Sequence, residues 1–127
     1  MKKILLTLVI TAISFTAASK DKNSNFSNSE ICKAGIAASV FRKPKGIKAI
    51  SSQKNNITIF YIRDDGRKYT YQCRIQNKEI RWKDQTMSKW NRNLKLFYKI
   101  SKDGKQITID TVAFGDTISK TYAKSDF

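Results

Sequence analysis

The stretch ITIFYIRDDGRKYTYQCRIQNKEIRWK, residues 57–83, decides the fold class of this chain. Within it, β-branched and aromatic residues alternate with polar ones, which is the pattern of strands in a sheet. The alternation breaks at Asp64-Asp65-Gly66 and at Asn77-Lys78, residue types that favour tight turns. We therefore predict three antiparallel strands joined by two hairpin turns.

The same pattern continues on both sides of this stretch. No proline follows Pro44, so nothing interrupts an antiparallel meander. We expect about seven strands, in an open curved sheet or a partly closed barrel. The expected strands are Ile47–Gln53, Ile57–Arg63, Lys68–Gln76, Glu79–Lys83, Leu94–Ser101, Gln106–Phe114 and Thr117–Ala123.

A helix is predicted before the strands. Ser27 and Glu30 have the spacing of a capping box, and Phe26 and Ile31 have that of a hydrophobic staple. The helix should end near residue 41 or 42, before Pro44. The fold class is therefore α+β, with one helix packed on the sheet.

The two cysteines of the chain, Cys32 and Cys73, are predicted to form a disulfide. Cys32 shares one helix face with Ile36 and Val40, and Cys73 falls on the apolar face of its strand. The small residues of the helix, such as Gly35, would let it approach the strands closely. A two-cysteine metal site is the weaker alternative, because zinc usually takes four ligands and the chain has no histidine.

The beginning of the chain has the features of a signal peptide, predicted to span residues 1–19. Lys2 and Lys3 precede an apolar run of about a dozen residues, and small residues follow at Ala18 and Ser19. A retained membrane anchor is the alternative. We expect a flexible lead-in at residues 20–26, a single domain at residues 27–127, and a location in the bacterial periplasm or exterior.

The chain is strongly basic, with 25 Lys and Arg against 10 Asp and Glu. Such a charge attracts anions, so lipopolysaccharide phosphates, acidic glycans and acidic proteins are candidate partners. The composition of an AT-rich genome is the alternative explanation. No helix-turn-helix, zinc finger or RNA-binding signature is present, and no specific nucleic-acid partner is expected.

The residue inventory argues against an enzyme. The chain has no histidine, and its only glutamates are Glu30, already assigned to the capping box, and Glu79. Asp64 and Asp65 form the one adjacent carboxylate pair, but Asp-Asp-Gly is typical of a hairpin turn. We expect no catalytic residue, no metal site and no cofactor.

The predicted binding surface consists of the expected strand Glu79–Lys83 and the loop that follows it. Both tryptophans lie there beside basic residues, an arrangement that can stack on sugars or bases while the cations hold anions. Trp82 is in phase with Ile80, so a core position is favoured for it. For Trp90, the alternative to a binding role is that its ring covers an open end of the sheet. The expected binding residues are Lys83, Lys89, Trp90, Arg92 and Lys95.

Several stretches resemble a group of small exported bacterial proteins of unknown function. They are Ile31–Ala37 with its Ile-Cys-Lys-Ala sequence, Tyr61–Gly66 with the Asp-Asp-Gly turn, Tyr71–Arg74, and Ile80–Trp82. The resemblance covers about residues 31 to 83. It implies that the cysteine pair and the order of helix then strands form a shared framework, and it carries over no activity or ligand.

Taken together, these patterns favour a non-enzymatic exported protein that binds an anionic partner, as an inhibitor or accessory subunit. The alternative is an envelope lipid- or glycan-binding module that uses the surface around Trp90. A third interpretation is a hydrolase that uses Asp64 or Asp65.

Overall fold

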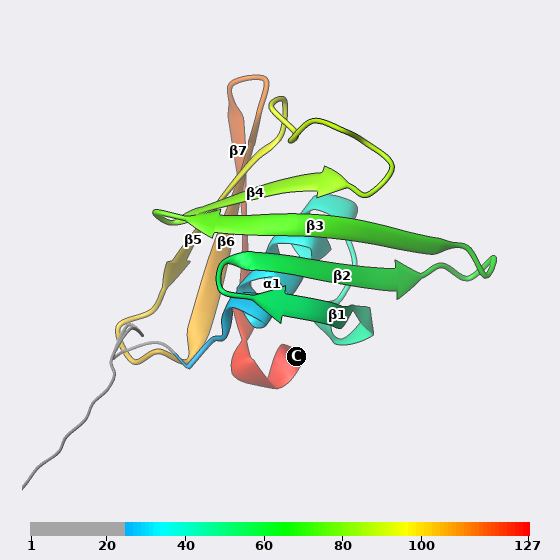
Figure 1. The fold of residues 1–127 in the computed structure, drawn as a ribbon. Coiled ribbons are helices and arrows are strands. Elements are labelled where there is room, and N and C mark those ends of the chain that lie inside the picture. Colours follow the sequence, from blue (N-terminus) through cyan, green and yellow to red (C-terminus); the bar gives the residue numbers. More distant parts are fainter. Residues whose placement is uncertain (1–24) are drawn as a thin grey trace, which may run out of the picture.

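The structure is a computed structural model that describes residues 25–127, one helix followed by seven strands (Figure 1). The helix is α1 (Asn28–Val40), and the short 3-10 turns η1 (Pro44–Gly46) and η2 (Lys124–Asp126) precede β1 and follow β7. The strands are β1 (Lys48–Gln53), β2 (Asn56–Ile62), β3 (Lys68–Gln76), β4 (Glu79–Asp84), β5 (Lys95–Ile100), β6 (Gln106–Ala113) and β7 (Asp116–Ala123). The predicted signal peptide, residues 1–19, and residues 20–24 of the lead-in lie outside the described residues.

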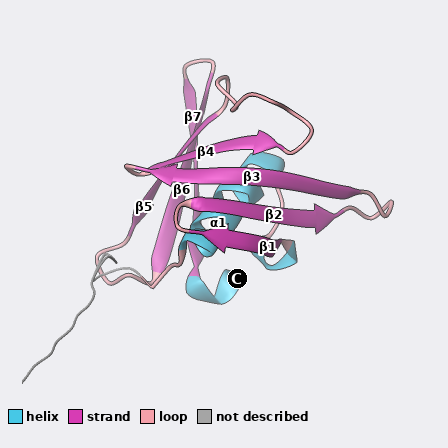
Figure 2. Cartoon of the chain, viewed as in Figure 1, coloured by secondary structure: helices cyan, strands magenta, loops and turns pink. Residues whose placement is uncertain are grey.

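The strands form one antiparallel sheet in which each pairs with its neighbours in the sequence. Within residues 25–127, β1 and β7 are the edges of the sheet and do not pair with each other. The predicted α+β fold is confirmed, and of its two predicted forms the protein has the open sheet and not the barrel. In Figure 1, β1 to β4 run across the view, while β6 and β7 run up it. The sheet thus curves around α1, which contacts β1 to β6 (Figure 2).

The sheet changes direction between β4 and β5. Only two residue pairs join these strands, Glu79 with Phe97 and Ile80 with Leu96. By contrast, β3 and β4 are paired from Tyr71–Asp84 to Gln76–Glu79. Because the remaining residues of β4 have no partner on β5, the two strands are free to diverge.

The predicted hairpin turns are confirmed. Asn77 and Lys78, between β3 and β4, both have positive φ angles, 49° and 69°, as a two-residue type I′ turn requires. Between β2 and β3, Gly66 has a φ of 87°, and the Asp65 carboxylate accepts the Arg67 N–H at 3.0 Å. The side chain of Asp65 therefore supports the turn.

The N-terminal end of α1 has the predicted capping box. The Ser27 hydroxyl accepts the Glu30 N–H at 3.1 Å, and the Glu30 carboxylate accepts the Ser27 N–H at 3.0 Å. Phe26 is buried and packs edge-on against the Phe127 ring. Phe26, the last residue of the predicted lead-in, thus belongs to the core.

The other end of α1 is set by Phe41. This residue caps the helix in the left-handed conformation, with φ 58° and ψ 46°, and its N–H donates to the Ala37 carbonyl. The backbone therefore leaves the helix before it reaches Pro44. Val40, the last residue of the helix, is partly buried and packs against the core.

One hydrophobic core lies between α1 and the sheet. Gly35 permits the close approach of the two, because a Cβ at this position would stand 2.8 Å from Ile80 Cδ1. The most deeply buried strand residues include Ile57, Ile59, Ile80, Leu96, Ile107 and Ile109.

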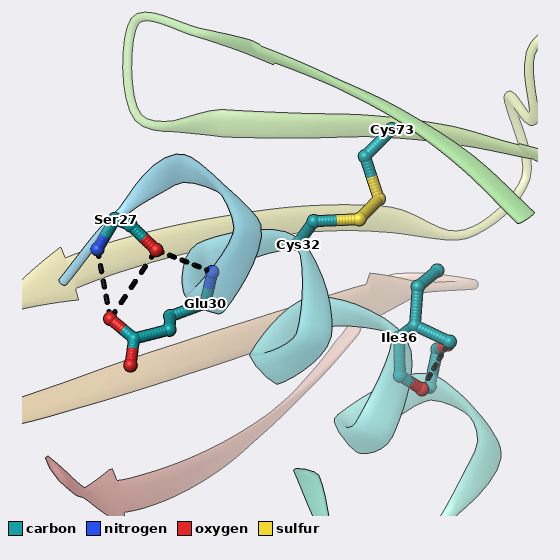
Figure 3. The surroundings of a disulfide bond; sticks show 6 residues. Ser27, Glu30, Cys32, Ile36 and Cys73 are labelled. Carbon is teal, nitrogen blue, oxygen red and sulfur yellow. Dashed lines mark hydrogen bonds between the residues drawn. A yellow bond between two sulfur atoms is a disulfide. The ribbon is translucent and has the colours of Figure 1, made fainter. Parts of the chain in front are cut away.

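The predicted disulfide joins α1 to β3 inside this core (Figure 3). Cys32 and Cys73 are almost completely buried, and their Cα atoms are 5.9 Å apart, within the range that disulfides prefer. The bond connects residues 41 positions apart in the sequence. It holds the helix to the centre of the β2–β3–β4 part of the sheet.

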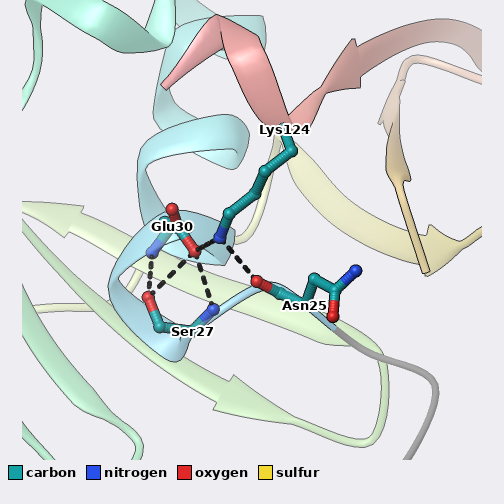
Figure 4. A network of polar contacts seen from close by, with 4 residues as sticks. All are labelled: Asn25, Ser27, Glu30 and Lys124. Carbon is teal, nitrogen blue, oxygen red and sulfur yellow. Dashed lines mark hydrogen bonds and ion pairs between the residues drawn. The ribbon is translucent and has the colours of Figure 1, made fainter.

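A polar network joins the start of α1 to η2 (Figure 4). The Lys124 ammonium donates to the Glu30 carboxylate and to the Asn25 carbonyl. Burial raises the pKa of Glu30, but the hydrogen bonds from Lys124 and Ser27 outweigh this effect, and the net pKa is below its ordinary value. The ionised carboxylate is thus the form that the folded state stabilises.

Among residues 25–127, no helix has both the length and the apolar character needed to cross a membrane.

Replacing both cysteines by alanine is expected to lower the free energy of unfolding by about 3 to 4 kcal/mol, because the unfolded chain regains the freedom of a long loop. Urea unfolding of the oxidised protein and of the Cys32→Ala, Cys73→Ala variant measures the change. A reducing agent should destabilise the native chain similarly and leave the variant unaffected. Equal stability of the two proteins would contradict the prediction.

Substituting Glu30 by glutamine should reduce the dependence of stability on pH. Because the folded-state pKa of Glu30 is lowered, its contribution is complete above the ordinary value near 4.5 and is lost as the pH falls through the folded-state value. Urea unfolding between about pH 7 and pH 3 should show a smaller loss for Glu30→Gln than for the native chain. Parallel curves would show that the Lys124 contact does not favour the ionised carboxylate.

Candidate functional site

The feature with the clearest binding chemistry lies on the outer face of the sheet, opposite α1. The ring of Trp90 contacts two cations: the Arg74 guanidinium is 4.8 Å and the Lys83 ammonium 5.1 Å from the ring centroid. Arg74 comes from β3 and Lys83 from β4, strands that are neighbours in the sheet. We call these three residues the Trp90 cluster.

Trp90 reaches the sheet because the loop between β4 and β5 folds back along β4 (Figure 1). The Asn91 N–H donates to the Trp82 carbonyl at 2.8 Å, on the part of β4 that β5 leaves unpaired. The Asn91 side chain accepts the N–H groups of Asn93 and Leu94. These hydrogen bonds hold Asn91 against β4, and the backbone next to it therefore keeps the Trp90 ring over the sheet.

Trp82 lies on the opposite face and has a different role. It packs against the core, its ring centroid is 5.8 Å from that of Tyr71, and its indole N–H donates to the Leu94 carbonyl at 3.1 Å. Trp82 therefore lies on the core-facing side of the sheet, partly buried against the core. The two tryptophans are separated by the sheet alternation, because Trp82 faces α1 while its neighbour Lys83 faces Trp90.

A shallow hollow of about 260 Å³ lies beside Trp90 and Arg74 on the outer face. The Arg74 guanidinium donates to the Asn56 side-chain oxygen at 3.0 Å, which fixes it above the Trp90 ring. The other lining side chains are mostly polar hydroxyls and amides, from Ser51, Gln53, Thr58 and Gln72. Such groups can exchange hydrogen bonds with hydroxyl-rich molecules.

The structure brings together only part of the predicted binding surface. Lys83 and Trp90 are in contact, whereas Lys89 and Arg92 are exposed on the loop and Lys95 is exposed on β5. Within residues 25–127, none of these last three makes a cation–π contact with Trp90. They were grouped with Trp90 by proximity in sequence, but the loop at Lys89 and Arg92 and the start of β5 at Lys95 leave their side chains away from the ring.

Arg74 is the member of the cluster that sequence reasoning missed. The alternation of β3 placed it on the polar face, and the hairpin pairs it with Arg81 of β4. Nothing local, however, indicates that Trp90, on a loop after β4, returns to cover it. The pairing of Arg74 with the Trp90 ring is a tertiary contact.

The carboxylates considered for catalysis lie elsewhere. Asp64 and Asp65 are exposed in the β2–β3 turn, where Asp65 forms an ion pair with Arg67 at 3.6 Å. In the part of the chain that the structure describes, no group of three His, Cys, Asp or Glu side chains is arranged to hold a metal ion.

In structural terms the chain is an α+β protein, one helix joined by a disulfide to an open seven-stranded sheet, with an aromatic and cationic cluster on its outer face. Comparison of the chain with protein-family models, with curated proteins and with solved structures found no match.

Replacement of the two tryptophans by alanine should separate their roles. Trp82→Ala is expected to lower the free energy of unfolding by about 2 to 4 kcal/mol, because it removes a large ring that packs against the core and donates to the Leu94 carbonyl. Trp90→Ala should cost about 1 kcal/mol, because it removes the contacts of the ring with Arg74 and Lys83. Urea unfolding of the two variants tests this difference, and an equal cost for both would show that Trp90 is a core residue.

Proposed function

We propose that this chain is a small exported protein without catalytic activity that binds an anionic partner in the bacterial envelope or exterior, as an inhibitor or accessory subunit of a larger protein. The observation that carries the proposal is the Trp90 cluster. Tryptophan and arginine are the residue types that most often dominate the binding energy of an interface. Here both stand on the outer face of a paired sheet, which provides a rigid support.

The charges of the cluster favour an anionic partner. Within residues 25–127, neither Arg74 nor Lys83 forms an ion pair with a carboxylate. A partner with acidic groups would supply the missing counter-charge. The net charge of +13 that remains without Lys2 and Lys3, 23 Lys and Arg against 10 Asp and Glu, would speed its approach.

Export is supported by two features. The Cys32–Cys73 disulfide is of the kind that persists in oxidising compartments such as the periplasm, and residues 1–19 have the pattern of a signal peptide. The partner is therefore sought among envelope and secreted molecules.

An acidic glycan is the second candidate partner. The polar hollow beside Trp90 favours it, because sugars stack on an indole ring while hydroxyl and amide side chains bind their hydroxyl groups. The same polarity argues against the acyl chain of a lipid, which would need an apolar lining.

The proposal is tested by affinity capture. The oxidised, processed protein serves as bait in a bacterial envelope extract, with washes rising to about 1 M salt, where attraction between exposed charges is screened. We expect one acidic protein to remain bound at high salt. Bait with Trp90→Ala or Lys83→Glu should lose it, because these changes remove the ring or reverse a charge of the cluster.

Lys102→Glu is the matched control, since it makes the same charge change on the exposed turn between β5 and β6. Retention by this variant and loss by Lys83→Glu would locate binding at the cluster. An acidic glycan held in the same way would favour the second candidate. A mixture of anions that elutes early from every bait would overturn the proposal.

A further inference from the structure

A second surface, which shares no residue with the Trp90 cluster, lies between the C-terminal end of α1 and β7. It is a groove of about 730 Å³. Its apolar lining comes from Ala37 and Ala38 of the helix, Phe41 after it, and Ile118 of β7. Phe41 and Ile118 are large apolar side chains that are 86% and 62% exposed. The fold thus leaves uncovered a surface that resembles a docking groove.

Phe41 is an unfavourable residue for the position it occupies. A left-handed helix cap is normally glycine, and a bulky side chain there costs conformational energy. The exposed ring also gains little from burial in the core. Within the described residues, no burial of the ring offsets this conformational energy. Contact with a partner therefore accounts for a phenylalanine at this position better than the stability of the fold does.

Basic side chains surround the apolar lining. Within residues 25–127 none of these cations forms an ion pair, and Asp126 is the one carboxylate that lines the groove. Asp126 is already engaged, because its carboxylate accepts the Ala123 N–H at 2.7 Å. The cations that line the groove are Arg42, Lys43, Lys45 and Lys120.

One side of the groove is an edge of the sheet. β7 pairs with β6 along its whole length without a bulge, and within the described residues no strand pairs with its other side. Its residues from Asp116 to Thr121 are all exposed. The opposite edge differs, since β1 has a bulge between Ala49 and Ser51. A long, regular edge strand is a template for an additional strand.

The side chain of Tyr122 forms part of the buried wall of the groove. Its hydroxyl is buried and, among residues 25–127, is the one buried side-chain polar atom without a hydrogen-bond partner. Burial and the nearby charge of Asp126 raise the pKa of Tyr122, so the hydroxyl keeps its proton.

We infer that this groove binds an acidic segment of another protein, which lies extended beside β7 and places an apolar side chain between Phe41 and Ile118. The basic lining selects the charge, the edge of β7 selects the extended conformation, and the two exposed side chains select an apolar anchor. A second copy of this chain would bring like charges to the groove. The inference is independent of the function proposed for the Trp90 cluster.

The test begins with a selection of displayed random peptides of about twelve residues on the oxidised, processed protein. We expect the enriched peptides to alternate acidic and apolar residues. Fluorescence polarisation then measures their affinity for variants. Lys120→Glu and Phe41→Gly should each weaken binding at least about tenfold, because one reverses a groove charge and the other removes the apolar contact.

Two controls separate binding from folding and from the other surface. Phe41→Gly should melt at the same temperature as the native chain or higher, because glycine suits the left-handed cap. Trp90→Ala and Lys102→Glu should bind the peptides normally. Hydrogen exchange should slow at the β7 amides when the peptide binds, as expected for a new strand.

Several results would overturn the inference: no enrichment of acidic peptides, equal binding by the native chain and the groove variants, unchanged exchange at β7, or a dimer joined through β7. Failure of the Trp90 proposal would appear instead as an envelope partner that Trp90→Ala bait retains. The two failures are therefore distinguishable.

Discussion

The disulfide between Cys32 and Cys73 joins α1 to β3, and the rest of the core is arranged around this junction. A buried bond of this kind keeps the helix against the sheet at one point. Gly35, three residues later on the helix, has no Cβ and so allows the helix backbone to lie close to the Ile80 side chain. Because the helix lies so near, the sheet covers it by curving, and the change of direction falls where β4 and β5 share only two residue pairs. A small domain thereby encloses one helix without closing its sheet.

The divergence of β4 and β5 also creates the Trp90 cluster. The part of β4 that lacks a β5 partner is paired instead by the loop, through the bond from Asn91 to the Trp82 carbonyl. That bond places Trp90 over Arg74 and Lys83, on the face away from the core. The two tryptophans, eight positions apart, consequently serve opposite purposes. Trp82 packs against the core, while the half-buried Trp90 presents an aromatic ring on the outer face.

The two candidate surfaces have different chemistry. The Trp90 cluster combines one aromatic ring with cations beside a polar hollow, whereas the groove at β7 combines exposed apolar side chains with a basic lining. Both surfaces carry cations that form no ion pair within residues 25–127, so part of the positive charge of the chain is gathered at these two places. Phe41 is exposed and holds a conformationally costly left-handed backbone, a combination that folding alone does not explain. An open sheet with a regular edge at β7 makes such a second contact possible, which a closed sheet would not.

Local patterns in the sequence determined the strands, the hairpin turns, the capping box and the cysteine pair, because each depends on residues close together or on a simple period. They also placed Lys83 and Arg74 on the polar face and Trp82 on the core face. Only the tertiary structure decided that the sheet is open, that Trp90 covers Arg74, and that Phe41 and Ile118 share a groove. These features depend on the path of an irregular loop and on where a helix end meets a strand far along the chain. No local period encodes such meetings, which is why Lys89, Arg92 and Lys95 were grouped with Trp90 by proximity in sequence alone.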